Sequence, residues 1–389
     1  MPLPGNQPRC EVCADKLVKN GTTSAGRTRW RCRRCGASKT QQRTDITARA
    51  EIRSFHRWVL SSDSQHQFGL TDRGFRKRIA WCWDIEVPRP TPTGEVHRQI
   101  LVDGTYFQDW CVLIAYDAAH VLGWQWCATE NKPAWAALLS QLPGPDVVVT
   151  DGGPGLRAAL DQQWPGAAIQ RCYFHIYAAV RRHITQAPKL EANQQILALT
   201  KRLMKVGDLD AAAAWMGAYA SWEAKWAQFL AERTYARPGV ERPGWVKPHQ
   251  RWWYTHLRSR RVRGLYRQLI SDKSLFTWLE PDYLDSERTP VVARTTSPLE
   301  GGPNRAIKDL LRTHRGMPEA HARRAVDWLL NSLTEDPHDP WELARGHLQR
   351  LAAPQPSPQI EEPIGPALYD TATTAEEGLW ARSGWVRNR

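Results

Sequence analysis

Two aspartates follow apolar runs that are typical of buried strands. Asp103 follows the run 100–102, Asp151 follows the valine run 147–149 and its threonine, and each precedes a glycine. Either aspartate alone fits a turn, because Asp-Gly is a common turn pair. Two carboxylates at the ends of neighbouring strands repel each other unless a cation binds them. Since Mg²⁺ prefers oxygen ligands and takes one or two protein carboxylates, the pair predicts a divalent-metal site.

A third carboxylate, Glu300, lies in the segment 293–316. Ser297 is the expected N-cap and Pro298 the first residue of a helix, which places Glu300 in its first turn. Basic residues follow on one side of this helix, namely Arg305, Lys308, Arg312 and Arg315. A carboxylate ahead of a basic stripe suits a metal beside a phosphate backbone, and an ordinary basic surface helix is the alternative.

Four of the eight cysteines form one paired motif near the N-terminus. Cys10 and Cys13 are two residues apart, as are Cys32 and Cys35, and 18 residues separate the pairs. This spacing predicts a zinc ribbon, in which four thiolates hold a structural Zn²⁺ and leave no open position for catalysis. A redox motif and haem attachment are disfavoured, because the accompanying strand pattern and histidine are missing.

Positive charge is concentrated around this motif. The chain has a net charge of +13, and residues 1–60 hold 13 Lys and Arg against 4 Asp and Glu. A basic block indicates a polyanionic partner such as double-stranded DNA, with a solvated basic face as the alternative. The candidate DNA contacts are Arg29, Arg31 and Arg33 in the ribbon, and Arg73, Arg76 and Lys77 in a later helix.

Hydrophobic periodicity and turn residues predict the elements that position these groups. Gly69 and Thr71 mark a turn and an N-cap between two helices, as in a helix-turn-helix. Strands followed by alternating helices and strands predict an α/β sheet of mixed direction. The expected segments are 1–40, ribbon; 45–86, helix-turn-helix DNA-binding domain; 87–97, linker; 98–187, first part of the α/β core; 188–290, helical insertion without strands; 291–335, second part of the core; and 353–389, a disordered Pro-rich tail.

Two other motifs admit different chemistry. Gly153-x-Gly155-x-x-Ala158 follows a strand like a dinucleotide-binding loop, but no acidic residue follows at the expected distance and Asp151 would repel a pyrophosphate. Cys172 and His175 fit either a nucleophilic pair or a packing and hydrogen-bonding feature. No apolar run reaches the length of a membrane span and no apolar signal core is present, so we expect a cytoplasmic protein.

Taken in order, the motifs VDGTYF, VVTDGGPGL, RCYFH and TTSPLEGGPNRAIKDLLRTHRG resemble those of bacterial insertion-sequence transposases of the mutator type. The resemblance covers about residues 8–335. It implies an RNase H-like catalytic core interrupted by an all-helical insertion, after an N-terminal zinc ribbon and helix-turn-helix. It also implies that Asp103, Asp151 and Glu300 form a DDE triad, and that Cys172 and His175 are a structural Cys-x2-His signature.

The expected function is therefore a DDE transposase associated with the bacterial nucleoid. The triad would hold two Mg²⁺ (or Mn²⁺) ions that activate water for cleavage at the element's end and stabilise the leaving 3′ oxygen, after which the 3′-OH attacks target DNA. No small-molecule substrate or membrane partner is expected. The alternative is a catalytically inactive DNA-binding protein derived from a transposase.

DNA recognition is expected from the basic N-terminal segments. The ribbon and the helix-turn-helix would bind the terminal inverted repeats, and because two ends must be joined at one target, we expect at least a dimer on DNA. In the insertion, Trp252 or Trp253 would grip or unstack DNA near the cleavage site, or else fill the insertion's core.

Overall fold

The computed structural model describes residues 9–10, 12–40, 44–280 and 291–353. The chain divides after Ala344, and the architecture below belongs to the unit that precedes this division, except for the last residues of the C-terminal helix Pro340–Ala352. Within the described residues, no helix is both long and apolar enough to cross a membrane.

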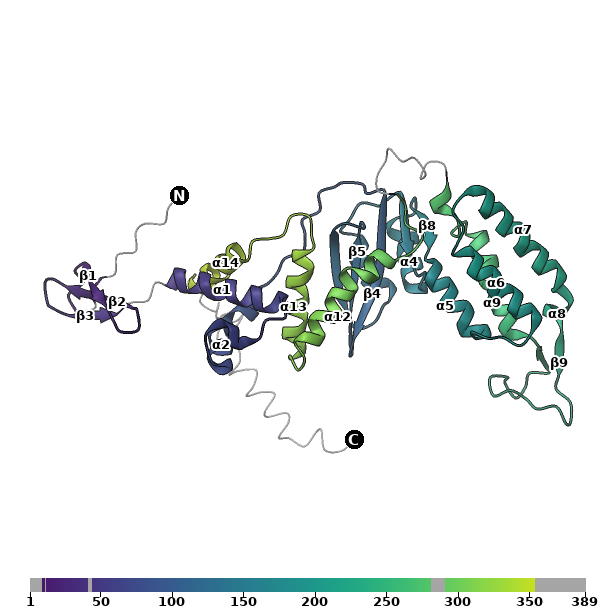
Figure 1. Ribbon diagram of the computed structural model, residues 1–389, viewed down its shortest axis with the longest axis horizontal. Coiled ribbons are helices and arrows are strands. Elements are labelled where there is room, and N and C mark those ends of the chain that lie inside the picture. The colour runs from purple at the N-terminus through teal and green to yellow at the C-terminus, as the bar shows by residue number, and fades with distance from the viewer. Residues whose placement is uncertain (1–8, 11, 41–43, 281–290, 354–389) are drawn as a thin grey trace, which may run out of the picture. The chain divides into compact units, whose positions relative to one another are not determined.

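A five-stranded mixed sheet carries the two aspartates (Figure 1). Its strand order is β6-β5-β4-β7-β8; the first three strands are antiparallel, whereas β7 and β8 run parallel to β4. The predicted α/β sheet of mixed direction is thereby confirmed. The strands are β4 (Gln99–Phe107), β5 (Trp110–Tyr116), β6 (Val121–Cys127), β7 (Val147–Thr150) and β8 (Ala168–Arg171), and the helices α3 (Lys132–Leu139) and α4 (Pro154–Gln163) connect β6 to β7 and β7 to β8.

Helices cover both faces of this sheet, which is why its strands are almost continuously apolar. Alternate residues of β4 point to opposite faces. Leu101 packs in a cluster with residues of the C-terminal helices such as Ile307, whereas Ile100 packs with residues of α3 and α4 such as Leu138 and Leu156. The core of the sheet therefore depends on segments from both ends of the chain.

The N-terminal region contains a small three-stranded sheet followed by helices. The elements are β1 (Leu17–Thr22), β2 (Thr28–Cys32), β3 (Ser38–Thr40), α1 (Thr44–Leu60), η1 (Gln65–Phe68), α2 (Asp72–Ile79) and η2 (Ala80–Asp84). As predicted, Gly69 adopts a left-handed turn conformation, and the Thr71 hydroxyl accepts a hydrogen bond from Gly74 N at 3.2 Å. Helix α1 packs against α13 (Glu319–Ser332), where Phe55 meets Trp328 edge-to-face. The helices of 44–84 therefore share one core with the C-terminal helices.

The insertion is not all-helical, so that prediction is wrong. Its helices are α6 (Glu191–Leu203), α7 (Leu209–Lys225), α8 (Ala227–Ala231), α9 (Leu257–Ser271) and η3 (Thr277–Leu279), after α5 (Tyr173–Ile184) of the core. Between α8 and α9, β9 (Arg233–Tyr235) and β10 (Trp252–Tyr254) form an antiparallel pair. Each strand has three residues, which is too short to give an alternating pattern in the sequence.

The segment after residue 291 forms α11 (Ser297–Gly301), α12 (Pro303–Thr313), α13 and α14 (Pro340–Ala352). The N-cap of α11 is Thr296 rather than the predicted Ser297, and the expected single helix breaks at Gly302. Gly302 adopts φ −96° and ψ −107°, and a Cβ there would lie 2.6 Å from the carbonyl oxygen of Pro298. Apart from residue 353, the predicted disordered tail lies outside the described residues.

Candidate active site

The sheet brings the two aspartates to adjacent positions on neighbouring strands. The parallel pairing of β4 with β7 ends at Val102 opposite Thr150, so Asp103 and Asp151 are the next residues of the two strands. Asp151 follows the end of β7, as predicted. Asp103 is not at a strand end, because β4 continues to Phe107 in its antiparallel pairing with β5.

Glu300 reaches the same site through helices α11 and α12. Helix α11 contacts β4, and in the first turn of α12 the Asn304 side-chain amide donates a hydrogen bond to Asp103 Oδ2 at 2.8 Å. His175, on the first turn of α5, lies with Nδ1 3.8 Å from Glu300 Oε1. The tertiary structure therefore gathers the three predicted carboxylates and His175 from four segments of the chain.

Burial and neighbouring carboxylates together shape the electrostatics of the site. Burial raises the pKa of Asp103 to about 7, and the charges of Asp151 and Glu300 act in the same direction. A hydrogen bond with Cys172 raises the pKa of His175 to about 9 against the effect of burial, with help from the charges of Asp151 and Glu300. A positive charge at the site is thus favoured, and a divalent cation would relieve the repulsion further.

The Cys172 thiol connects the Cys-x2-His motif to Glu300. Cys172 Sγ lies 3.3 Å from Thr296 N and 3.2 Å from Thr296 Oγ1, and the same hydroxyl donates to Glu300 Oε1. The Cys172 side chain has no exposed surface, so it cannot reach a substrate as a nucleophile would. Its contacts instead orient the segment that carries Glu300.

Two polar residues near the triad gave no signal in the sequence. Gly104 makes room for Glu130, because a Cβ at Gly104 would lie 2.4 Å from Glu130 Oε1. Burial and the charge of Asp151 both raise the pKa of Glu130, which makes it a fourth carboxylate of this region. In the sequence, Glu130 directly precedes Asn131, the N-cap of α3. A solvent-exposed glutamate is common at such a position, so the sequence did not mark Glu130 as part of the site.

The second residue, Asn304, is 2% exposed, and within the described residues its Oδ1 has no hydrogen-bond partner. A buried amide oxygen without a partner is costly unless a ligand or water binds it. Asn304 and the carboxylates of Asp103, Asp151 and Glu300 each offer oxygen atoms, the ligand type that Mg²⁺ and Mn²⁺ prefer. The chemistry of these side chains, including the unpartnered Oδ1 of Asn304, therefore suits a divalent metal ion.

The loop after β7 depends on Gly152, whose φ is +80°. Because a residue with a Cβ is strained at this φ, and the Cβ would also displace the Arg171 guanidinium group, we expect Gly152→Ala to lower the free energy of unfolding by about 1–3 kcal/mol. Gly153→Ala is the matched control, because its Cβ would meet nothing closer than 3.8 Å and its φ is −55°. Urea unfolding of both variants measures the difference, and equal stabilities would contradict the steric argument.

Among the described residues, two groups of side chains have their ligand atoms within 4.8 Å of one another: Cys172, His175 and Glu300, and the four N-terminal cysteines. The cysteines are the group suited to zinc. Their sulfur atoms lie within 4.8 Å of one another, with 3.4 Å between Cys10 and Cys35 and 3.5 Å between Cys13 and Cys32. Sulfur atoms around a tetrahedral Zn²⁺, with bonds of about 2.3 Å, are about 3.8 Å apart. Backbone N–H groups of Cys13 and Val12 lower the pKa of Cys10 to about 7, which favours the thiolate. The cluster fits zinc.

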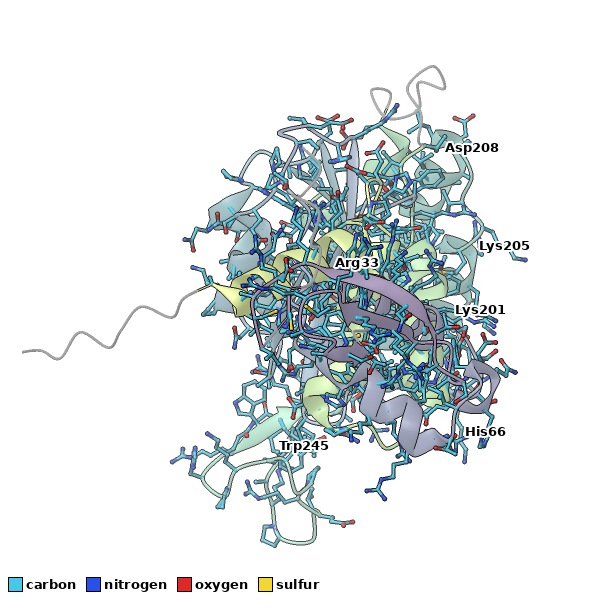
Figure 2. The ribbon with its side chains drawn as sticks, turned by 90° about the vertical axis from the view of Figure 1, so that its left-hand side faces the viewer. Arg33, His66, Lys201, Lys205, Asp208 and Trp245 are labelled. Carbon is cyan, nitrogen blue, oxygen red and sulfur yellow. The ribbon has the colours of Figure 1, made fainter. Side chains whose placement is uncertain are left out.

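All the predicted DNA-contacting cations are exposed. Arg29, Arg31 and Arg33 lie on the three-stranded N-terminal module (Arg33 is labelled in Figure 2), and Arg73, Arg76 and Lys77 lie on α2. On α12, Asp309 partly neutralises the stripe, because Arg312 lies 2.8 Å and Arg305 3.6 Å from its carboxylate. Lys308 and Arg315 have no ion pair among the described residues.

The fold is a mixed α/β sheet, and carboxylates near its β4–β7 edge are groups that a divalent metal ion could bind. Residues 111–236 match the family described as "Transposase, Mutator family". Over 74 residues the chain is 34% identical to the "Transposase for insertion sequence element IS905" of Lactococcus lactis subsp. lactis (strain IL1403). This match covers 18% of the chain and 19% of the relative. The resemblance to mutator-type insertion-sequence transposases is confirmed by these two matches.

Proposed function

We propose that this protein is a DDE transposase with an RNase H-like core. One observation carries the proposal: Asp103 and Asp151 are in register on adjacent strands, and Asn304 ties the segment of Glu300 to Asp103. The strand order, with three antiparallel strands followed by two parallel ones, supports the RNase H-like assignment. Asp151, Cys172 and His175 also lie within the segment that matches the Mutator family.

Asp103, Asp151 and Glu300 would hold the metal ions, and when bound, a pair of Mg²⁺ or Mn²⁺ ions supplies an activated water and stabilises the leaving 3′ oxygen. Asp103 must release its proton to bind, and the amide of Asn304 orients the resulting carboxylate. Thr296 and Cys172 fix the position of Glu300. Cleavage at the element's end frees a 3′-OH, which then joins target DNA.

The basic segments would hold the DNA. We assign the four-cysteine module as a zinc ribbon and α2 as the second helix of a helix-turn-helix. The arginines of the ribbon and the cations of α2 would contact the terminal inverted repeats. The cations of α12 follow Glu300 along the chain and would face backbone phosphates beside the cleaved bond. Two ends must meet at one target, so the active complex contains at least two copies of the chain.

The test uses DNA that flanks the gene. Purified protein is incubated with labelled end fragments and Mg²⁺ or Mn²⁺, and the products are examined for nicks with a 3′-OH at a defined base and for joining to a target. Binding is measured in parallel. If the protein binds the ends but neither cuts nor joins them in either ion, the protein is a DNA-binding relative without chemistry.

Metal binding is expected to depend on pH because the ligands must lose protons. Asp103, with a pKa near 7, is protonated below pH 7. We therefore expect Mn²⁺ to raise the melting temperature more at pH 8 than at pH 6. Without divalent ions, the stability of the protein should change with pH in the opposite direction. The stabilisation that comes from burying neutral Asp103 is fully present below the unfolded pKa of about 4 and is lost as the pH rises through 7.

Differential scanning fluorimetry across this range measures both effects. Asp103→Asn is the comparison, because it removes the titrating group and should flatten both profiles. A Mn²⁺-induced shift that is equal at pH 6 and pH 8 in the wild type would contradict the assignment of Asp103 as a ligand.

A further inference from the structure

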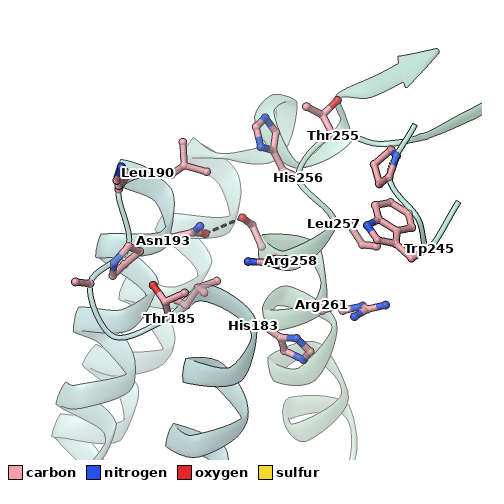
Figure 3. Close-up of a pocket in the computed structure, with 16 residues that line it drawn as sticks. His183, Thr185, Leu190, Asn193, Trp245, Thr255, His256, Leu257, Arg258 and Arg261 are labelled. Atoms are coloured by element: carbon pink, nitrogen blue, oxygen red, sulfur yellow. Dashed lines mark hydrogen bonds between the residues drawn. The ribbon is translucent and has the colours of Figure 1, made fainter. Parts of the chain in front are cut away.

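The insertion contains a cavity of about 700 Å³, which is within the usual size range for ligand pockets. It lies between the C-terminal end of α5, the N-terminal ends of α6 and α9, and the loop that precedes β10 (Figure 3). None of the described residues that line it is acidic. The cavity is separate in sequence from the triad, and the proposed chemistry makes no use of it.

Cations surround this cavity. Lys189, Arg258 and Arg261 line it, all three are exposed, and no ion pair engages them within the described part of the chain. Burial lowers the pKa of His183, another lining residue, and the charges of Arg261 and Arg258 lower it further. These groups make the cavity attractive to an anion.

The N-terminus of α9 reinforces this field. Helix α9 begins at Leu257 with no side-chain cap and no acidic residue in its first turn, whereas α6 begins at Glu191, whose carboxylate opposes an anion. Free N–H groups at a helix N-terminus bind phosphate groups well. The lining residues Leu190, His256 and Leu257 bring both N-termini to the cavity.

An exposed indole lies at the mouth of the cavity. Trp245, on the loop between β9 and β10, is 54% exposed and lines the cavity (Figures 2 and 3). The two tryptophans singled out in the sequence are less suited to contact DNA. Trp253 is 5% exposed, and Arg233 stacks over the ring of Trp252 at 4.1 Å. Trp253 is buried, as expected from the alternative that these tryptophans fill the insertion's core.

We propose that this cavity binds one unpaired nucleotide of DNA, with its phosphate at Arg258 and Arg261 and its base stacked on Trp245. The inference rests on the proposed function for the identity of the polymer. Bases within a duplex are stacked on their neighbours and present no face to an indole, whereas an extrahelical base does. A concave, cationic site with one free aromatic face therefore selects an unpaired nucleotide over intact duplex.

The experiment compares two labelled end fragments that differ only in whether one 2-aminopurine near the element's end is paired or unpaired. The full-length, zinc-loaded protein binds them without Mg²⁺ or Mn²⁺, so no cleavage intervenes. We expect roughly tenfold or greater preference for the unpaired fragment and quenching of its fluorescence by the indole. Trp245→Ala should abolish the preference, whereas Trp245→Phe should retain part of it.

Two further variants sharpen the test. Arg258→Gln combined with Arg261→Gln should weaken binding of the unpaired fragment and reduce the slope of log affinity against log salt by about 0.7 for each phosphate that is no longer neutralised. Tyr235→Ala is the matched control, because Tyr235 is a 48% exposed aromatic residue of β9 that does not line the cavity. It should leave the preference unchanged.

Equal binding of both fragments by the wild type, or a preference that survives Trp245→Ala, overturns the inference. Failure of the proposed function has a different signature. If the triad variants still cut DNA while the preference depends on Trp245, the catalytic assignment fails and the nucleotide site stands. If cutting requires the triad but no preference exists, the nucleotide site alone is wrong.

Discussion

Asp103→Asn, Asp151→Asn and Glu300→Gln are each expected to reduce cleavage of the element's ends by about 10³-fold or more. A bound metal ion contributes several kcal/mol to stabilising a phosphoryl transition state, and each 1.36 kcal/mol corresponds to a factor of about ten in rate. An amide in place of a carboxylate removes the ligand charge while nearly keeping its shape. Single-turnover cleavage measures the loss, with binding of the ends measured on the same preparations.

The structure predicts that Asp103→Asn will fold normally without metal. Its Oδ can still accept the hydrogen bond from Asn304, and burial beside Asp151 already favours a neutral group at this position. Asp146→Asn is the matched control, because Asp146 is an exposed carboxylate that precedes β7 at its opposite end. Full cleavage by any one triad variant would remove that residue from the metal site.

Loss of one zinc ligand is expected to have the second-largest effect. The core of the N-terminal module consists of Leu17 and two of the cysteines, with Trp30 partly buried against them. So small a core cannot stabilise three short strands without a metal, and structural zinc contributes on the order of 10 kcal/mol. Cys32→Ser should therefore unfold this module and release its zinc.

The measurable consequences are the metal content and the affinity for the ends. The wild type should contain one zinc ion per chain by mass spectrometry of the metal, and Cys32→Ser none. End binding should weaken by about tenfold or more, because Arg29, Arg31 and Arg33 lose their fixed positions. Cys127→Ser, a half-buried cysteine of β6, should leave both quantities unchanged. Undiminished end binding by Cys32→Ser would exclude the module from DNA recognition.

The N-terminal helices are in direct contact with the C-terminal helices of the core. His314 Nε2 lies 3.0 Å from the carbonyl oxygen of Val59, and Trp83 stacks on His321 with ring centroids 4.2 Å apart. His314 follows α12, the helix that begins beside Glu300. A displacement of α1 or η2 would therefore be transmitted to the segment that contains Glu300.

The sequence by itself determined the features that depend on local chemistry. Cysteine spacing predicted a cluster that the structure forms, Gly69 and Thr71 fixed a turn and a cap, and apolar runs fixed the mixed sheet. These signals are readable because zinc-ligand geometry, capping and strand burial each act over a few neighbouring residues. The sequence even predicted that Asp103 and Asp151 lie at the same site, because each follows an apolar run typical of a buried strand.

Only the tertiary structure decided which distant groups complete the site. Glu130 lies against Gly104 from another element, and Asn304 meets Asp103 across 201 residues of sequence. The break at Gly302 arises from a steric limit at one carbonyl, and the β9–β10 pair arises from strands too short to show a period. In the sequence, nothing distinguishes Trp245 from the other tryptophans among the 20 of the chain; in the structure, its side chain is exposed whereas that of Trp253 is buried. Except for the break at Gly302, which arises within four residues, these features depend on contacts between residues far apart in the chain, which no local pattern encodes.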